Sequence, residues 1–119
     1  MYMLSVGNNY AYPITIQSDV VNTVNPGHSV QIEEALGNAY ITVPGIGQML
    51  VHDIGDRQIG GFSKATWGVF IAYQGEEVVF RYEGGGQIKV TFNDLGQAQL
   101  EANGGISRID LGAFILPGE

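Results

Sequence analysis

Apolar residues in this chain come in short runs that are broken at regular intervals by Gly, Asn and Asp. The pattern is clearest in the second half, where five runs follow one another: Thr66–Tyr73, Glu77–Tyr82, Gln87–Phe92, Gln97–Glu101 and Ile106–Leu111. The segments between them are Gln74-Gly75, Gly84–Gly86, Asn93–Gly96 and Asn103–Gly105. Runs of β-branched and aromatic residues between such turns are typical of consecutive antiparallel hairpins. The sequence therefore predicts a five-strand meander from Thr66 to Leu111.

The first half also has a β pattern, although its rhythm is less regular. Five further strands are expected here: Met3–Val6, Pro13–Gln17, Ser29–Glu33, Ala39–Val43 and Gln48–His52. Asn25-Pro26-Gly27 predicts a tight turn, because Pro presets φ and Gly accepts positive φ. The segment Asp53–Lys64 holds three glycines and four charges, which indicates a long loop between the two halves.

The fold class follows from these runs and from the absence of any helical period. Gly accounts for 18 of the 119 residues, too many for long helices to persist between them. We expect a single all-β domain over residues 1–119, an antiparallel β-sandwich or flattened barrel of nine to ten short strands. In Thr66–Tyr73, Trp67, Val69 and Ile71 share one face while Phe70 lies on the other, which predicts that this strand is covered on both sides.

The charge balance excludes one class of partner. The chain has 12 acidic and 5 basic residues, a formal net charge of −7, and the basic residues are spread singly. Nucleic acids require clustered Lys and Arg, so we expect no nucleic-acid binding. There is no cysteine, which rules out disulfides and a cysteine nucleophile.

The charged fraction is only 14%, against roughly 25% in ordinary soluble domains. Mean hydropathy is slightly positive, at +0.07. Either neutral polar residues cover the surface, or part of the surface is buried against other chains. The N-terminus lacks the features of a signal peptide, and no run is long enough to cross a membrane as a helix. This pattern leaves the location of the protein open and is compatible with a virion or with secretion by a non-Sec route.

No constellation in the sequence predicts enzymatic activity. Nothing around Ser63 resembles a nucleophile elbow, although His52 could in principle act as a base. Glu33-Glu34 and Glu76-Glu77 are sequence neighbours, so each pair diverges to opposite faces of a strand. Gly84–Gly86 precedes a strand and lacks the Lys-Ser/Thr of a phosphate loop. We therefore expect a protein that is not an enzyme and needs no cofactor.

Two groups of residues are candidate sites. Tyr10 and Tyr12, beside Asn8 and Asn9, could form a surface on which a sugar stacks, since tyrosines and amides are common at such surfaces and at protein interfaces. The alternative is that these tyrosines are half-buried strand residues. His52, Asp53 and Asp56 supply one imidazole and two carboxylates near a Gly turn, which is a possible metal site. The alternative is a polar strand end, because His52 and Asp53 point to opposite faces if both lie in a strand.

Together these observations favour a non-enzymatic structural or assembly protein, which packs against copies of itself or against a larger scaffold such as a virion or surface array. Two alternatives remain open: a lectin-like module that binds carbohydrate or cell surfaces, and a small membrane-active toxin component. The pattern resembles small β-sandwich lectins, bacterial β-rich toxins and phage decoration proteins at the level of fold class alone.

Overall fold

The computed structural model of the chain describes residues 2–35, 38–55 and 67–109, and all of its regular elements in these ranges are strands. The first six are β1 (Tyr2–Asn8), β2 (Ile14–Gln17), β3 (Val21–Val24), β4 (Ser29–Ala35), β5 (Asn38–Val43) and β6 (Gly47–Gly55). The other three are β7 (Trp67–Tyr73), β8 (Glu76–Phe92) and β9 (Ala98–Ile109). The all-β prediction is confirmed. The described residues include no helix that is long and apolar enough to cross a lipid bilayer.

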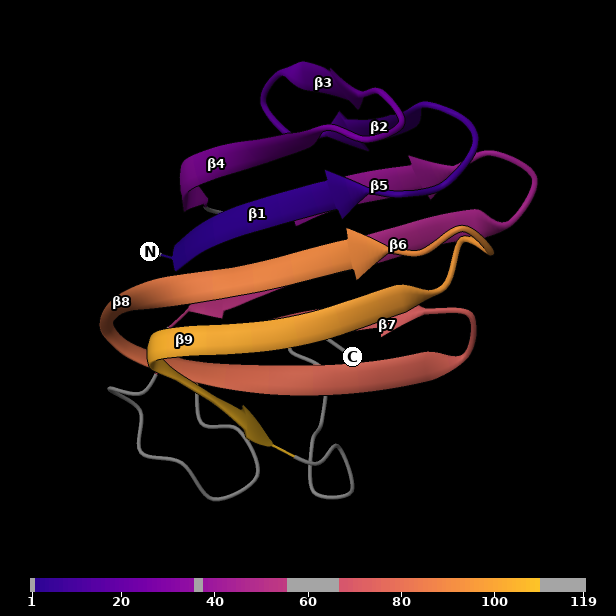
Figure 1. Cartoon of the computed structure of the whole chain (residues 1–119). Coiled ribbons are helices and arrows are strands. Elements are labelled where there is room, and N and C mark those ends of the chain that lie inside the picture. Colours follow the sequence, from indigo (N-terminus) through magenta and orange to yellow (C-terminus); the bar gives the residue numbers. More distant parts are fainter. Residues whose placement is uncertain (1, 36–37, 56–66, 110–119) are drawn as a thin grey trace.

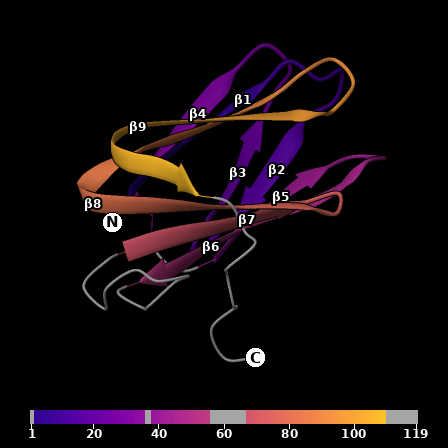
Figure 2. The same cartoon turned by 90° about the horizontal axis from the view of Figure 1, so that it is seen from below.

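All nine strands belong to one sheet, which folds over so that its two halves face each other (Figure 1). The front half contains β4, β1 and the second part of β8 with the first part of β9. The back half contains β3, β2, β5, β6, β7 and the first part of β8. Figure 2 separates the two layers, with β1, β4 and β9 on one side and β6 and β7 on the other. The architecture lies between a sandwich and an incompletely closed barrel, as the sequence predicted.

The long β8–β9 hairpin is shared by both halves, and here the structure differs from the predicted meander. Gly84–Gly86 and Asn103–Gly105 do not end strands: each bends a strand that continues, so three long strands replace the five expected. The two bends lie opposite each other, with Gly86 paired to Gly104 and the register shifted beside them. Glycines permit this because a side chain at Gly86 would collide with the partner strand. The hairpin can therefore turn the corner between the halves.

The bend also produces a pairing that the sequence did not predict. Along one edge of β8, residues before the bend pair antiparallel with β7, and residues after it pair in parallel with β1. The sheet is therefore mixed, although every other pair is antiparallel. β3 was also missed, because Val20–Val24 is too short and too polar to stand out from its turns.

The core lies between the two halves and is built from alternate residues of nearly every strand. The front half contributes Leu4, Val6, Ile88, Val90 and Phe92, and the back half contributes Ile16, Ile41, Met49, Val69, Ile71 and Phe80. Phe70 is buried although it lies on the opposite face of β7, as the sequence predicted. Lys89 points outward and is exposed.

Candidate functional site

The loop after β1 is held by Asn8, one of the four residues predicted to bind a sugar. Asn8 is 1% exposed, and its side-chain amide nitrogen donates to the carbonyl oxygens of Val24 at 2.8 Å and Tyr12 at 2.9 Å. Its side-chain oxygen accepts from the backbone N–H of Tyr10 at 2.8 Å. Three of the polar contacts that an Asn side chain can make are thus used inside the protein. Asn8 fastens the end of β1 to β3.

The two tyrosines of this loop lie together, but they are not equally open. Their rings pack edge to face with centroids 5.6 Å apart. The Tyr10 hydroxyl donates to the carbonyl oxygen of Pro44 at 3.2 Å, which ties this ring to the turn after β5. Tyr12 is 57% exposed, and Asn9 is exposed beside it. Of the predicted sugar site, Tyr12 and Asn9 remain available to a ligand.

The predicted metal residues are separated by the strand geometry. His52 and Asp53 are neighbours in β6 and point to opposite faces of the sheet. His52 Nδ1 is hydrogen-bonded to the side-chain oxygen of Asn38, whereas an Asp53 carboxylate oxygen accepts from the Tyr82 hydroxyl at 3.1 Å. Asp56 lies outside the described residues. In the ranges that the structure describes, no three His, Cys, Asp or Glu side chains gather to hold a metal ion.

Tyr2 and Tyr82 form a buried aromatic pair beside Asp53, a grouping that the sequence did not predict. Their ring centroids are 5.9 Å apart, and both rings are almost fully buried. Burial raises the pKa of each phenol above its ordinary value, and the negative charge of Asp53 raises both further. The cluster lies where β1 meets the bend of β8, so it places two neutral phenols at the junction of the two halves, and that of Tyr82 donates to Asp53.

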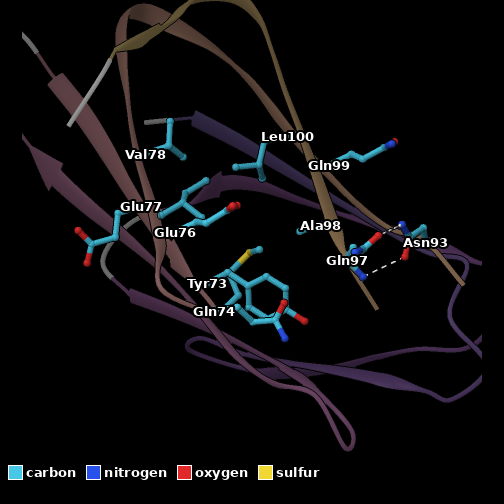
Figure 3. A pocket seen from close by; sticks show the side chains of 12 residues that line it. Tyr73, Gln74, Glu76, Glu77, Val78, Asn93, Gln97, Ala98, Gln99 and Leu100 are labelled. Atoms are coloured by element: carbon cyan, nitrogen blue, oxygen red, sulfur yellow. Dashed lines mark hydrogen bonds between the residues drawn. The ribbon is translucent and has the colours of Figure 1, made fainter. Parts of the chain in front are cut away.

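A cavity of about 390 Å³ opens between the first part of β9 and the β7–β8 hairpin. In Figure 3, Leu100 and Ala98 of β9 lie across the cavity from Val78 and Tyr73. Met49 and Ile71 complete an apolar floor that belongs to the core. The turn after β8 closes one end, where Asn93 and Gln97 hydrogen-bond to each other through their side chains. This cavity lies where the folded sheet does not close into a barrel.

A second hollow lies on the outer face of the front half, and we call it the polar trough. It has a volume of about 500 Å³ and is lined by residues of β1, β4, β8 and β9 together with the turn before β4. Its lining residues are Ser5, Gly7, Asn8, Asn9, Gly27, His28, Ser29, Gln31, Gln87, Lys89, Thr91, Glu101 and Asn103. Alternation along Gln87–Phe92 places Lys89 and Thr91 on the face opposite Ile88 and Val90, and so toward water. It could not show that they adjoin β1, because that pairing joins residues far apart in the chain.

The outer face of the back half is different in character. Strand register aligns Val21, Gln17, Tyr40, Leu50 and Ala72 in one row across β3, β2, β5, β6 and β7, and we call this row the apolar row. Four of its five members are apolar. Val21 is 64% exposed at the end of the row, and Tyr40 is also exposed. This face therefore offers apolar surface to water at the free edge of the sheet.

Comparisons of the chain with protein-family models, with curated protein sequences and with solved structures found no match. The function proposed below therefore rests on the geometry of these two outer faces.

Proposed function

We propose that this chain is a non-enzymatic assembly subunit, and that it pairs with a second copy of itself through the free edge of β3. The observation that carries the proposal is that this edge strand contains no charged residue and begins beside two exposed valines. Among the described residues β3 has β2 as its strand partner, so its other side has no strand beside it, although the Val24 carbonyl at its end accepts from Asn8. Val20, just before β3, and Val21, its first residue, are 63% and 64% exposed. An exposed apolar edge strand is a template for another strand.

Two other strands also have an edge without a strand partner in the described structure, but both carry charged residues. β4 contains Glu33 and Glu34 in its sequence, and β9 contains the exposed Glu101. Charged residues on an edge strand discourage pairing with another chain. The segment Val20–Val24 contains no charged residue. β3 is thus the edge strand to which another strand can add with the least opposition from charged side chains.

A second copy is the partner that suits this edge. Two β3 strands can pair antiparallel about a two-fold axis through Asn22, which places Val21 of each copy opposite Thr23 of the other. Such an interface is self-complementary by symmetry. With a net charge of −7, two copies repel each other, and they approach most easily where the surface is uncharged. The apolar row continues inward from Val21, so the dimer would extend one apolar face across both copies.

Sedimentation analysis at micromolar concentrations tests the proposal. The wild-type chain is expected to form a concentration-dependent dimer, and Val21→Lys is expected to be monomeric because it places two like charges diagonally across the axis on the same face of the joined sheet. Leu95→Lys is the matched control: Leu95 has the same 64% exposure but lies in the turn after β8. This control should keep the dimer. A monomeric wild-type chain, or a dimer that survives Val21→Lys, would overturn the proposal.

A further inference from the structure

We propose that the polar trough on the front half is a binding site for a neutral oligosaccharide. This site lies on the outer face of the front half, whereas the assembly proposed above uses β3 of the back half. It includes Asn8 and Asn9 of the sugar site that the sequence predicted, but neither Tyr10 nor Tyr12 is among its described lining residues.

The trough is built from aligned rows of polar side chains across four strands. One row consists of Gln31, Ser5, Lys89 and Glu101, which register places side by side on β4, β1, β8 and β9. Gln87 and Asn103 pair in a neighbouring row. Four strands spaced by about 4.8 Å give a surface roughly 14 Å across, which accommodates a short chain of sugar rings.

Ser5 is the feature that points to a ligand. It lines the floor of the trough and is only 7% exposed. No described residue forms a hydrogen bond with its hydroxyl, whereas every fully buried side-chain polar atom in the described structure has a partner. The Ser5 oxygen is therefore reached from the trough. A hydroxyl recessed in this way can exchange its hydrogen bond with solvent for one with a ligand, at a net gain of about fivefold in affinity, or about 1 kcal/mol.

Gly7 deepens the floor next to Ser5. Register places it opposite Thr91, and a methyl group added at Gly7 would meet only the Thr91 side chain, at 3.8 Å. The fold could therefore hold an alanine here. Long side chains such as Gln31, Gln87 and Lys89 surround the two small residues, which makes a hollow with polar walls.

The chemistry of the lining selects the class of ligand. Amides and hydroxyls both donate and accept hydrogen bonds, which matches a molecule that carries many hydroxyl groups. Among the described lining residues Lys89 is the one Lys or Arg, and Glu101 stands opposite it, so an anionic ligand is disfavoured. An extended peptide is disfavoured as well, since β1 and β8 are paired on both edges here and offer it no free backbone groups. The part of the lining that the structure describes contains no aromatic ring, so we expect the affinity to rest on hydrogen bonds.

The test is a titration of the isotope-labelled chain with three neutral probes, cellohexaose, maltohexaose and mannohexaose, followed through the backbone amide signals. At least one probe is expected to shift amides of trough residues such as Ser5, Gln31 and Lys89. Ser5→Ala removes the hydroxyl and should weaken binding by about fivefold, which corresponds to the loss of one ordinary hydrogen bond. Gly7→Ala should also weaken binding, because its methyl group fills the floor.

Thr42→Ala is the matched control, since Thr42 is an exposed hydroxyl residue on the outer face of the back half. It should bind the probe as the wild-type chain does. Amide spectra of the free variants show whether each has kept its fold. Absence of shifts with all three probes would overturn the proposal, and so would shifts confined to the loop around Tyr12. Val21→Lys should bind the oligosaccharide as the wild-type chain does. The binding result therefore does not depend on whether the chain forms a dimer.

Discussion

The front and back halves of this sheet share one core but present opposite surfaces to the outside. Their inner faces carry the same kinds of residue, mostly Val, Ile and Phe. On the outer faces, the front half presents Ser5 and Lys89 in a hollow, whereas the back half presents Tyr40 and Val21 along a row. Because alternate residues of a strand face opposite sides, the outer set can change without disturbing the core. One fold can therefore carry two surfaces of different use.

Two junctions hold the front and back halves in their observed arrangement. At one end, Asn8 links β1 of the front half to β3 of the back half. At the other end, β8 and β9 bend together, with the Tyr2–Tyr82 pair beside the bend. Breaking a junction should disturb both outer faces at once. Changing one outer face should leave the other intact.

The largest effect is expected at Asn8. Asn8→Ala removes three hydrogen bonds of a residue that is nearly fully buried. At about 1 kcal/mol each, this should lower the free energy of unfolding by about 3 kcal/mol. Urea denaturation measures the loss. The control is Asn9→Ala, whose side chain is exposed and whose effect should stay within about 0.5 kcal/mol. Equal effects of the two variants would show that Asn8 does not join the halves.

The bend should be the next most sensitive point. In Gly86→Ala the new Cβ would lie 2.7 Å from Ile106 Cγ1 and 2.8 Å from the backbone oxygen of Asn103. The backbone oxygen cannot move without disturbing the hairpin, so we expect a loss of about 2 kcal/mol. Gly47→Ala provides the control, because nothing lies within 4 Å of its added methyl group. A Gly86→Ala variant as stable as Gly47→Ala would mean that the bend tolerates side chains.

The strands could be predicted from the sequence, whereas the bend at Gly86 and the order of the strands could not. Local alternation predicted the strands around Ile16 and Ile41, because each strand records its own buried face. Gly86 was predicted to lie in a turn, since a glycine cluster has the same composition in a turn and in a bend. The parallel pairing of β1 with β8 leaves no local signal, because parallel pairing is not fixed by a turn.

The candidate sites show the same limit. Features set by neighbours along one strand could be predicted, and features that combine distant segments of the chain could not. The sequence correctly separated His52 from Asp53 onto opposite faces, which depends only on their being neighbours in a strand. It did not predict the structural role of Asn8, since a hydrogen bond to a residue 16 positions away cannot be seen locally. The polar trough was missed because its rows combine residues from β1, β4, β8 and β9.

Alkaline pH should act on the junction near the bend. The pKa values of Tyr2 and Tyr82 are raised above 10.0 in the folded chain, whereas unfolded tyrosines have the ordinary value. The unfolded state therefore releases protons first, so the contribution of these two phenols to stability is constant below about pH 10 and is lost as the pH rises above it. Tyr82→Phe removes one of the two phenols and should make this decline shallower. Denaturant unfolding below and above pH 10 measures both slopes, and equal slopes would contradict the assignment.

The smallest effects on stability are expected at the two outer faces. Substitutions there test directly whether the two faces act independently. Ser5→Ala removes a hydroxyl without a protein partner, and Val21→Lys changes an exposed side chain, so each should alter monomer stability by no more than about 0.5 kcal/mol. Their functional effects should be reciprocal, with oligosaccharide binding weakened only by Ser5→Ala and self-association lost only in Val21→Lys. The double variant should show the sum of both, because Ser5 and Val21 lie on the outer faces of different halves of the sheet. If either single variant changes both properties, the two faces are coupled through the core, and the halves cannot be treated as independent surfaces.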